Sequence, residues 1–293
     1  MYTITQTQKE GLDYVELTGA TSKASICLSR GAALETLTLN NISLLADLHP
    51  LSYKDTYASS ILFPFANRIK DGKYTYNNQT FQLECNEENL NNALHGLVYN
   101  QLFQVADSKV ATESASVTLT YENNKPFAGF PYFFLLVVTY TLSEKGLELQ
   151  LKVTNKDPKA FPFTLGWHPY FLSDDLYKSS LTFKSNKTIA FDERMITKQV
   201  VNGAVPMPLE IKDQQLDNCY VLSDSKVVFK TPKYQMMIDS TASENFFQMY
   251  TPPVKNAIAL EPVTGVSDSF NNQMGVQELP SGASYQLAWS IKI

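Results

Sequence analysis

The sequence predicts an all-β protein built as a large antiparallel β-sandwich. Apolar and polar residues alternate with a period of two along much of the chain. Turn-forming residues recur at the short spacing typical of sandwiches, and no segment carries the start and stop signals of a helix longer than about two turns. A hydrophobic fraction of 44% and a charged fraction of 18% supply enough apolar surface for a packed core.

The alternation is clearest in five segments, which are 13–18, 72–81, 114–121, 147–153 and 284–293. In 147–153, leucine and valine alternate with polar residues, so we expect a strand with one buried face. This strand follows 139–142 across a turn at 143–146, which predicts a hairpin. The segment 72–81 predicts a second hairpin with Asn77 and Asn78 at its tip, since asparagine is a common turn residue.

No composition shift, repeat or low-complexity tract interrupts the chain, so we expect a single domain over residues 1–293. The apolar runs are too short to span a membrane, and the first residues lack the basic and apolar regions of a secretory signal. A net charge of −5 with three arginines excludes the basic footprint of nucleic-acid binding. We therefore expect a cytoplasmic protein, a monomer or homodimer, whose partner is a small molecule.

Cysteine usage argues against a cross-linked or thiolate-bound metal protein. The three cysteines, Cys27, Cys85 and Cys219, lie far apart and form no C-x-x-C pair. An odd number at this spacing predicts neither a disulfide framework nor a thiolate zinc site.

His168, one of three histidines, lies in the most aromatic stretch of the chain, the sequence TLGWHPYF at 164–171. On residue type alone, a packed and hydrogen-bonded ring is a more common explanation than catalysis. Alternation predicts that the neighbouring Trp167 points away from His168, so Trp167 is not expected to contact a ligand bound there.

The other two histidines lie in loops. His95 follows a polar loop and precedes Gly96, which permits close backbone approach, so it could cap a turn or face a ligand. His95 and His168 could share a metal, but the sequence offers no further His or Cys nearby and zinc prefers three or four such ligands. We expect no metal and no cofactor. His49 is expected in a surface loop.

Two charged residues follow apolar segments. Glu261 ends the apolar run 257–260, and Pro262 is expected to stop that strand. Burial there would raise the pKa of the carboxyl group, whereas an exposed glutamate on an edge strand is the alternative. Arg68 follows the apolar segment 63–66. Its guanidinium could hold a partner carboxylate in a structural salt bridge or hold sugar hydroxyls.

Five motifs occur in a fixed order: N-R-I at 67–69, N-A-L-H-G at 92–96, W-H-P-Y-F at 167–171, L-D-N-C-Y at 216–220 and L-E-P at 260–262. Together they resemble the aldose 1-epimerase (mutarotase) family. The likeness runs from about residue 30 to the C-terminal strand, which is nearly the whole chain.

The resemblance implies a fold, an activity and a set of residue roles. The fold would be the galactose-mutarotase-like β-sandwich. The activity would be interconversion of the α and β anomers of a free hexose or related aldose by acid/base ring opening and reclosure, without a cofactor. Glu261 falls on the general base and His168 on the general acid. His95, Arg68 and Asp217 fall on positions that bind the sugar.

The chain departs from the family pattern at Val263, where galactose-active members usually carry glutamine, and in the loop 264–272, so the preferred sugar does not carry over. Three alternatives stay open. A hexose-6-phosphate 1-epimerase would need a cationic clamp, for which Arg30 and Arg194 are the remaining arginines. A non-catalytic carbohydrate-binding protein could share the fold. A glycosidase would need a carboxylate pair such as Asp217 and Glu261.

Overall fold

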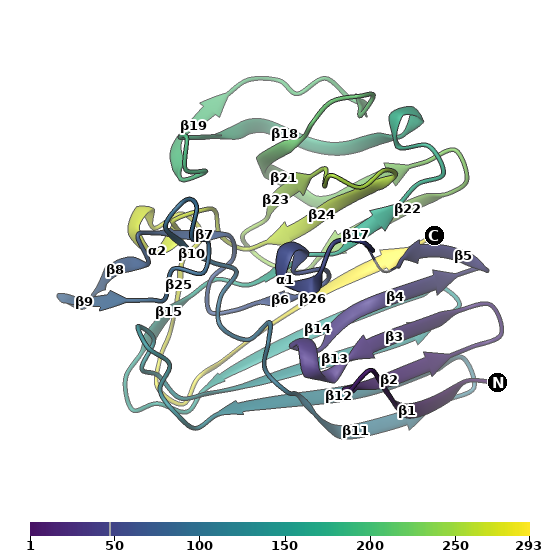
Figure 1. The fold of residues 1–293 in the computed structure, drawn as a ribbon, viewed down its shortest axis with the longest axis horizontal. Helices are drawn as coiled ribbons and strands as arrows, with labels where there is room; N and C mark the ends of the chain where they lie inside the picture. Colours follow the sequence, from purple (N-terminus) through teal and green to yellow (C-terminus); the bar gives the residue numbers. More distant parts are fainter. Residues whose placement is uncertain (47) are drawn as a thin grey trace.

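The computed structural model describes residues 1–46 and 48–293. Almost all of its regular structure is antiparallel strand, arranged mainly in a 15-stranded and a 5-stranded sheet (Figure 1). This confirms the predicted all-β class and the large antiparallel sheets. The helical segments in the described part of the chain are α1 (Tyr53–Thr56), α2 (Ser269–Asn272) and the 3-10 turns η1 (Leu28–Arg30) and η2 (Leu176–Lys178). No helix among those residues is long and apolar enough to cross a membrane.

The 15-stranded sheet runs through the whole molecule. Its main path, in spatial order, is β11 (Gln104–Val110), β12 (Ser114–Asn123), β13 (Phe134–Ser143), β14 (Gly146–Asn155), β26 (Ser284–Lys292), β22 (Gln235–Ser240), β21 (Asp217–Lys230), β23 (Phe246–Tyr250), β24 (Ala257–Val263), β16 (Gly166–Trp167) and β6 (Ile61–Leu62). Four strands join this path from the side, and they are β17 (Tyr170–Leu172), β18 (Ser180–Phe191), β19 (Thr197–Asn202) and β20 (Leu209–Glu210).

The remaining strands form smaller sheets. The 5-stranded sheet contains β1 (Thr3–Lys9), β2 (Leu12–Thr18), β3 (Lys23–Cys27), β4 (Ala33–Leu39) and β5 (Ile42–Leu45). The two-stranded pairs are β7 (Arg68–Lys70) with β10 (Asn92–Leu94), β8 (Lys73–Tyr76) with β9 (Gln79–Gln82), and β15 (Phe161–Phe163) with β25 (Gln277–Leu279).

Both predicted hairpins are confirmed. In β8–β9, Tyr76 pairs with Gln79 across a tip formed by Asn77 and Asn78, which both have positive φ. In β13–β14, Ser143 pairs with Gly146. The predicted strands at 13–18, 114–121 and 284–293 are also present, and each differs from its predicted bounds by one or two residues.

Part of the main core lies between the 5-stranded sheet and the β11–β14 part of the large sheet. Val15 and Leu17 of β2 belong to the same buried cluster as Leu119 of β12 and Leu136 of β13. The period-two pattern produces this core because alternate side chains of each strand face the opposite sheet.

The large sheet has two parts that are joined by one strand. β26 pairs with β14 on one side and with β22 on the other. It therefore connects β11–β14, which pack against the 5-stranded sheet, to the strands β22, β21, β23 and β24. The candidate site lies on this second part.

The predicted end of a strand at Pro262 is wrong. β24 continues to Val263, with Phe247 paired to Pro262. The Leu260 N–H points away from β23 to the Pro169 carbonyl, 3.1 Å away. Pro262, two residues on, would direct an N–H to the same side, where the neighbouring β16 and β17 are interrupted. A residue without an N–H is tolerated at this gap. Glu261 is accordingly inside the sheet, and the edge-strand alternative is also wrong.

Candidate active site

The five residues singled out from the sequence line one pocket of about 360 Å³. Glu261, His168 and His95 are buried, with exposed fractions of 3%, 5% and 8%. The pocket is completed by Asp55, Thr56, Tyr57, Asn67, Glu87, Asn89, Leu90, Leu94, Tyr170, Met195, Gln248 and Tyr250. The structure thus brings together residues that span positions 68 to 261.

Three of the pocket side chains, Asp217, Gln248 and Glu261, come from one face of adjacent strands. Gln248 of β23 lies directly opposite Glu261 of β24, and Cys219 of β21 lies opposite Gln248. Asp217 is two residues from Cys219, so its side chain is on the same face. Residues between these positions, such as Phe247 and Leu260, point into the main core. The strand alternation therefore sets the direction of Asp217, Gln248 and Glu261.

Arg68 begins β7 and His95 directly follows β10, and in this short pair Leu94 is opposite Arg68. The His95 N–H donates to the Asn67 carbonyl at 2.8 Å, and both residues adopt a left-handed backbone conformation. Gly96 follows with φ of 75°, and a Cβ there would lie 2.3 Å from the Phe63 carbonyl oxygen. Glycine is needed at this position because it allows close approach of the backbone. The segment that carries His95 therefore packs against the backbone at Phe63.

His168 lies in the interruption between β16 and β17. Its N–H donates to the Ser60 carbonyl at 3.1 Å, and its carbonyl accepts from the Ser59 N–H at 2.8 Å. The imidazole stacks on Tyr170 with ring centroids 5.0 Å apart and meets His95 edge-on at 4.9 Å. Trp167 has no exposed surface and belongs to the main core, as the alternation predicts.

His168 and Glu261 form a close titratable pair. His168 Nε2 is 3.4 Å from Glu261 Oε1, and both side chains are nearly excluded from water. Burial disfavours the charged form of each group. It lowers the pKa of His168 to about 4 and raises the pKa of Glu261 well above its usual value, with the nearby Asp217 adding to the increase. Both shifts are in the direction that favours a neutral imidazole and a neutral carboxyl group.

Several pocket atoms have unused hydrogen-bonding capacity. Gln248 Nε2 donates to Asp217 Oδ1 at 2.7 Å, while Gln248 Oε1 and the Nδ1 atoms of His95 and His168 are buried without a partner. Burial also raises the pKa of Asp217. Buried polar atoms in proteins are normally hydrogen-bonded, so this group of atoms is suited to a polar ligand with several hydroxyls.

Arg68 is held by a carboxylate. Its Nε lies 2.9 Å from Glu87 Oε2 and its Nη2 lies 2.7 Å from Glu87 Oε1, which is a bidentate pair. Nη1 donates to Asn67 Oδ1 at 3.2 Å. Because a guanidinium has five N–H donors, this pairing leaves donors for a ligand. Arg68 thus forms the salt bridge that was the first alternative. It also lines the pocket, as the second alternative, binding of sugar hydroxyls, requires.

Sequence reasoning missed Gln248, Glu87 and Met195 as pocket residues. Gln248 carries a signal, because it is the polar residue within the otherwise apolar strand FFQMY at 246–250 and is 3% exposed. Glu87 and Met195 lie in polar or irregular stretches and carry no comparable signal. No group of three or more His, Cys, Asp or Glu side chains within residues 1–46 and 48–293 is arranged to hold a metal ion.

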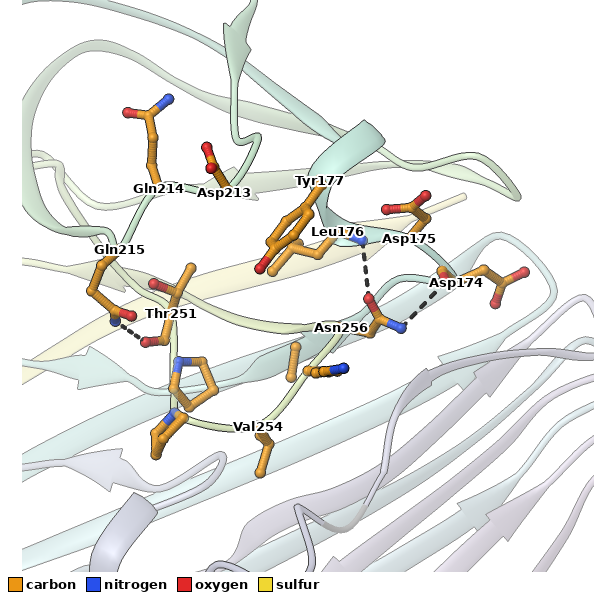
Figure 2. Close-up of a pocket in the computed structure, with 14 residues that line it drawn as sticks. Asp174, Asp175, Leu176, Tyr177, Asp213, Gln214, Gln215, Thr251, Val254 and Asn256 are labelled. Carbon is orange, nitrogen blue, oxygen red and sulfur yellow. Dashed lines mark hydrogen bonds between the residues drawn. The ribbon is translucent and has the colours of Figure 1, made fainter.

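A larger pocket of about 470 Å³ lies at the other end of β24 and is formed by 174–177, 213–215 and 251–257 (Figure 2). Its carboxylates, Asp174, Asp175 and Asp213, are half-buried or exposed on loops, and no histidine lines it. Figure 2 shows the exposed Tyr177 ring over this pocket. It therefore lacks the buried acid/base pair that distinguishes the smaller pocket.

Comparison with known proteins gives matches along nearly the whole chain. The sequence profile of the aldose 1-epimerase family matches residues 13–292. The uncharacterized protein YihR of Escherichia coli K12 is 25% identical over 279 residues, which cover 89% of this chain and 87% of that protein. A galactose mutarotase-like protein from Clostridium acetobutylicum has a TM-score of 0.89 at 18% identity, covering 99% of this chain and 98% of that one. A galactose 1-epimerase from Lactobacillus acidophilus has a TM-score of 0.81 at 16% identity, covering 100% and 98%.

Proposed function

Because this chain belongs to the aldose 1-epimerase family, we propose that it interconverts the α and β anomers of a free, uncharged aldose by opening and reclosing the sugar ring. The observation that carries the proposal is the buried His168–Glu261 pair, with 3.4 Å between the two polar atoms, in a pocket large enough for a small ligand. Two groups that share one proton are sufficient for the chemistry.

Ring opening requires two proton transfers. The C1 hydroxyl gives its proton to one group, and the ring oxygen receives a proton from the other as the C1–O5 bond breaks and C1=O forms. Rotation about C1–C2 then presents the other face of the aldehyde. Reclosure reverses both transfers, so the pair returns to its starting state and no cofactor or net proton is consumed.

The family resemblance assigns the base to Glu261 and the acid to His168. Desolvation favours the opposite tautomer in the unliganded site, with the proton on Glu261. The two tautomers differ by one proton transfer between neighbouring atoms, and each group must both accept and donate in a full cycle. We propose that the essential requirement is one proton shared by the pair, and that hydrogen bonds to the sugar decide which group carries it.

Sugar binding is assigned to His95, Arg68 and Asp217, with Gln248 added from the structure. Asp217 and the unpartnered Gln248 Oε1 can accept from hydroxyl groups, and Arg68 can donate through the hydrogens that Glu87 and Asn67 leave free. Arginine and carboxylates are suited to hydroxyl recognition because they supply several fixed donors and acceptors.

The charge of the pocket favours a neutral sugar over a hexose 6-phosphate. Among the described residues that line it, Arg68 is the cationic side chain and Glu87 neutralises it. Arg194 is bound to Asp71 and Arg30 to Glu35, and neither lines this pocket. A dianionic phosphate would therefore meet the Asp55, Asp217 and Glu261 side chains without a clamp of the kind that phosphates require.

The test is polarimetry of freshly dissolved α-glucose, α-galactose, xylose and arabinose with the purified protein, with glucose 6-phosphate run in parallel. We expect faster approach to anomeric equilibrium for at least one neutral sugar. Calorimetric binding of a sugar without any acceleration would instead make the chain a non-catalytic carbohydrate-binding protein, and acceleration of the phosphate alone would reverse the substrate class.

A further inference from the structure

One wall of the pocket comes from a distant hairpin. The connection 192–196 between β18 and β19, here called the arm, places Met195 against the pocket. Figure 1 shows the turn end of this hairpin on the same side of the molecule as β7 and β10. Met195 has φ of 60°, and its carbonyl accepts from Ser267 Oγ at 2.7 Å. This contact fixes the backbone of Met195 at the pocket, although the hairpin is otherwise peripheral.

Arg194 attaches the arm to the segment that leads to His95. Its Nε donates to the Leu90 carbonyl at 2.8 Å, and its Nη2 lies 2.8 Å from the Asn91 carbonyl and 3.0 Å from Asn92 Oδ1. Nη2 also lies 2.9 Å from Asp71 Oδ1. A guanidinium can join this many acceptors because its donors are held in one plane, which the single ammonium of lysine cannot reproduce.

Further polar contacts link Arg194 to Arg68. Asn92 has no exposed surface, and its Nδ2 lies 3.1 Å from the Arg194 carbonyl and 2.8 Å from Glu87 Oε2. Glu87 in turn forms the bidentate pair with Arg68. A single chain of polar contacts thus runs from Arg194 through Asn92 and Glu87 to the guanidinium that lines the pocket.

We propose that Arg194 is a positioning residue that sets sugar affinity by holding Met195 and, through Asn92 and Glu87, the Arg68 guanidinium. This proposal rests on the proposed function for the identity of the ligand. The contacts of Arg194 do not reach Glu261, which β24 positions, or His168, which is held by its backbone hydrogen bonds to Ser59 and Ser60. Loss of Arg194 is therefore expected to weaken substrate binding while the proton transfers continue at nearly their normal rate.

The first experiment compares Arg194→Ala and Arg194→Lys with the wild type by polarimetry. We expect KM to rise about tenfold in both variants with kcat within about threefold, because a binding contact is loosened and the reacting groups are not. The pH limits of kcat should stay in place. A wild-type KM in either folded variant would overturn the proposal, and Arg194→Lys serves if the alanine variant does not fold.

The matched control is Asp71→Ala. It removes the partner of Arg194 whose side chain is 48% exposed, together with the contact of that carboxylate to Asn91 Nδ2, and it keeps the three contacts of Arg194 to residues 90–92. Exposed ion pairs contribute little, so KM should stay within about twofold of the wild-type value. A KM as high as that of Arg194→Ala would mean that the surface charge pair, rather than the attachment of the arm, controls binding, and would also overturn the proposal.

A double variant tests whether Arg194 acts through Met195. Met195→Ala alone should raise KM, and the increase in Arg194→Ala/Met195→Ala should be smaller than the product of the two single increases, since coupled residues are not additive. A full product would show independent action and contradict the proposal. Calorimetric Kd values for the best-bound neutral sugar in the same variants distinguish this outcome from failure of the proposed function, which would appear as a wild type that binds sugar without accelerating mutarotation.

Discussion

The two sides of the pocket are built in different ways. On one side, Asp217, Gln248 and Glu261 project from neighbouring strands whose register fixes their spacing. On the other side, Arg68, His95 and Met195 come from short strands and connections that are held by side-chain hydrogen bonds and left-handed backbone positions. The first side carries one member of the acid/base pair, and the second carries mainly binding groups.

The two sides of the pocket therefore restrain their side chains to different degrees. A continuous sheet restrains a side chain through many backbone hydrogen bonds, which suits a group that must stay within proton-transfer distance of its partner. Connections on a rigid scaffold can vary more freely, which suits the recognition of different sugars. We therefore expect substitutions on the sheet side to lower kcat and substitutions on the connection side to raise KM.

The largest effect is expected for Glu261→Gln on the sheet side. The variant keeps the shape of the side chain and removes its proton chemistry, so kcat should fall by roughly 10²–10⁴-fold while sugar binding persists. Because burial raises the pKa of Glu261 above its unfolded value, folding takes up a proton and wild-type stability falls as pH rises between the two values. The variant should thus melt no lower than the wild type at pH 7.

Unchanged turnover in Glu261→Gln would remove the carboxyl from the mechanism. A marked fall in melting temperature would instead indicate a structural role. Asn218→Ala, on the opposite face of β21 and exposed, is a suitable control and should leave both quantities near the wild-type values.

His168 lies between the two sides of the pocket. The glutamine of His168→Gln cannot exchange a proton, so kcat should fall by roughly 10²-fold or more. The wild-type pH profile should be bell-shaped, because the pair is inactive with two protons or with none. Since burial lowers the pKa of His168 to about 4 and raises that of Glu261, the acid limit of kcat/KM should follow His168 and disappear in the variant. An acid limit that persists at the wild-type pH would assign it to another group, with His95 the next candidate.

Arg68→Lys should separate the connection side from the sheet side. The lysine cannot reproduce the bidentate contact with Glu87, so we expect stability to fall by about 1–3 kcal/mol together with an increase in KM and a nearly constant kcat. Thermal unfolding and polarimetry measure the two effects. A lower melting temperature with an unchanged KM would make Arg68 purely structural. Arg30→Lys, at a more exposed ion pair, is the control and should change stability by less than about 1 kcal/mol.

Dialysis against EDTA is expected to have the smallest effect. The proposed proton transfers use His168, Glu261 and the sugar alone, so activity should be unchanged. Loss of activity that zinc restores would show that His95, His168 and a carboxylate take part in metal binding and would place the chemistry on the connection side as well.

The sequence predicts the sheet side better than the connection side. Glu261 ends an apolar run that predicts a buried strand, Asp217 belongs to one of the motifs of the family resemblance, and Gln248 could have been found as a polar residue in an apolar strand. The sequence predicts that β24 ends at Pro262, and this prediction is wrong because the interruption of the neighbouring strands is a tertiary feature. Glu87 and Met195 could not be predicted, since their place in the pocket depends on contacts with segments that are far away in sequence. The direction of the pKa shift of His168 likewise follows from burial, which the sequence does not specify.

The position of β26 in the large sheet has a consequence for how the chain folds. Both partners of β26, β14 and β22, precede it in sequence, so both expose a hydrogen-bonding edge until β26 has been synthesised. Unpaired strand edges are templates for association with other chains, and long-range pairing of this kind forms slowly. During translation, the partly made chain would depend on chaperones or on rapid completion to avoid aggregation, and fragments that lack β26 should be insoluble rather than partly active.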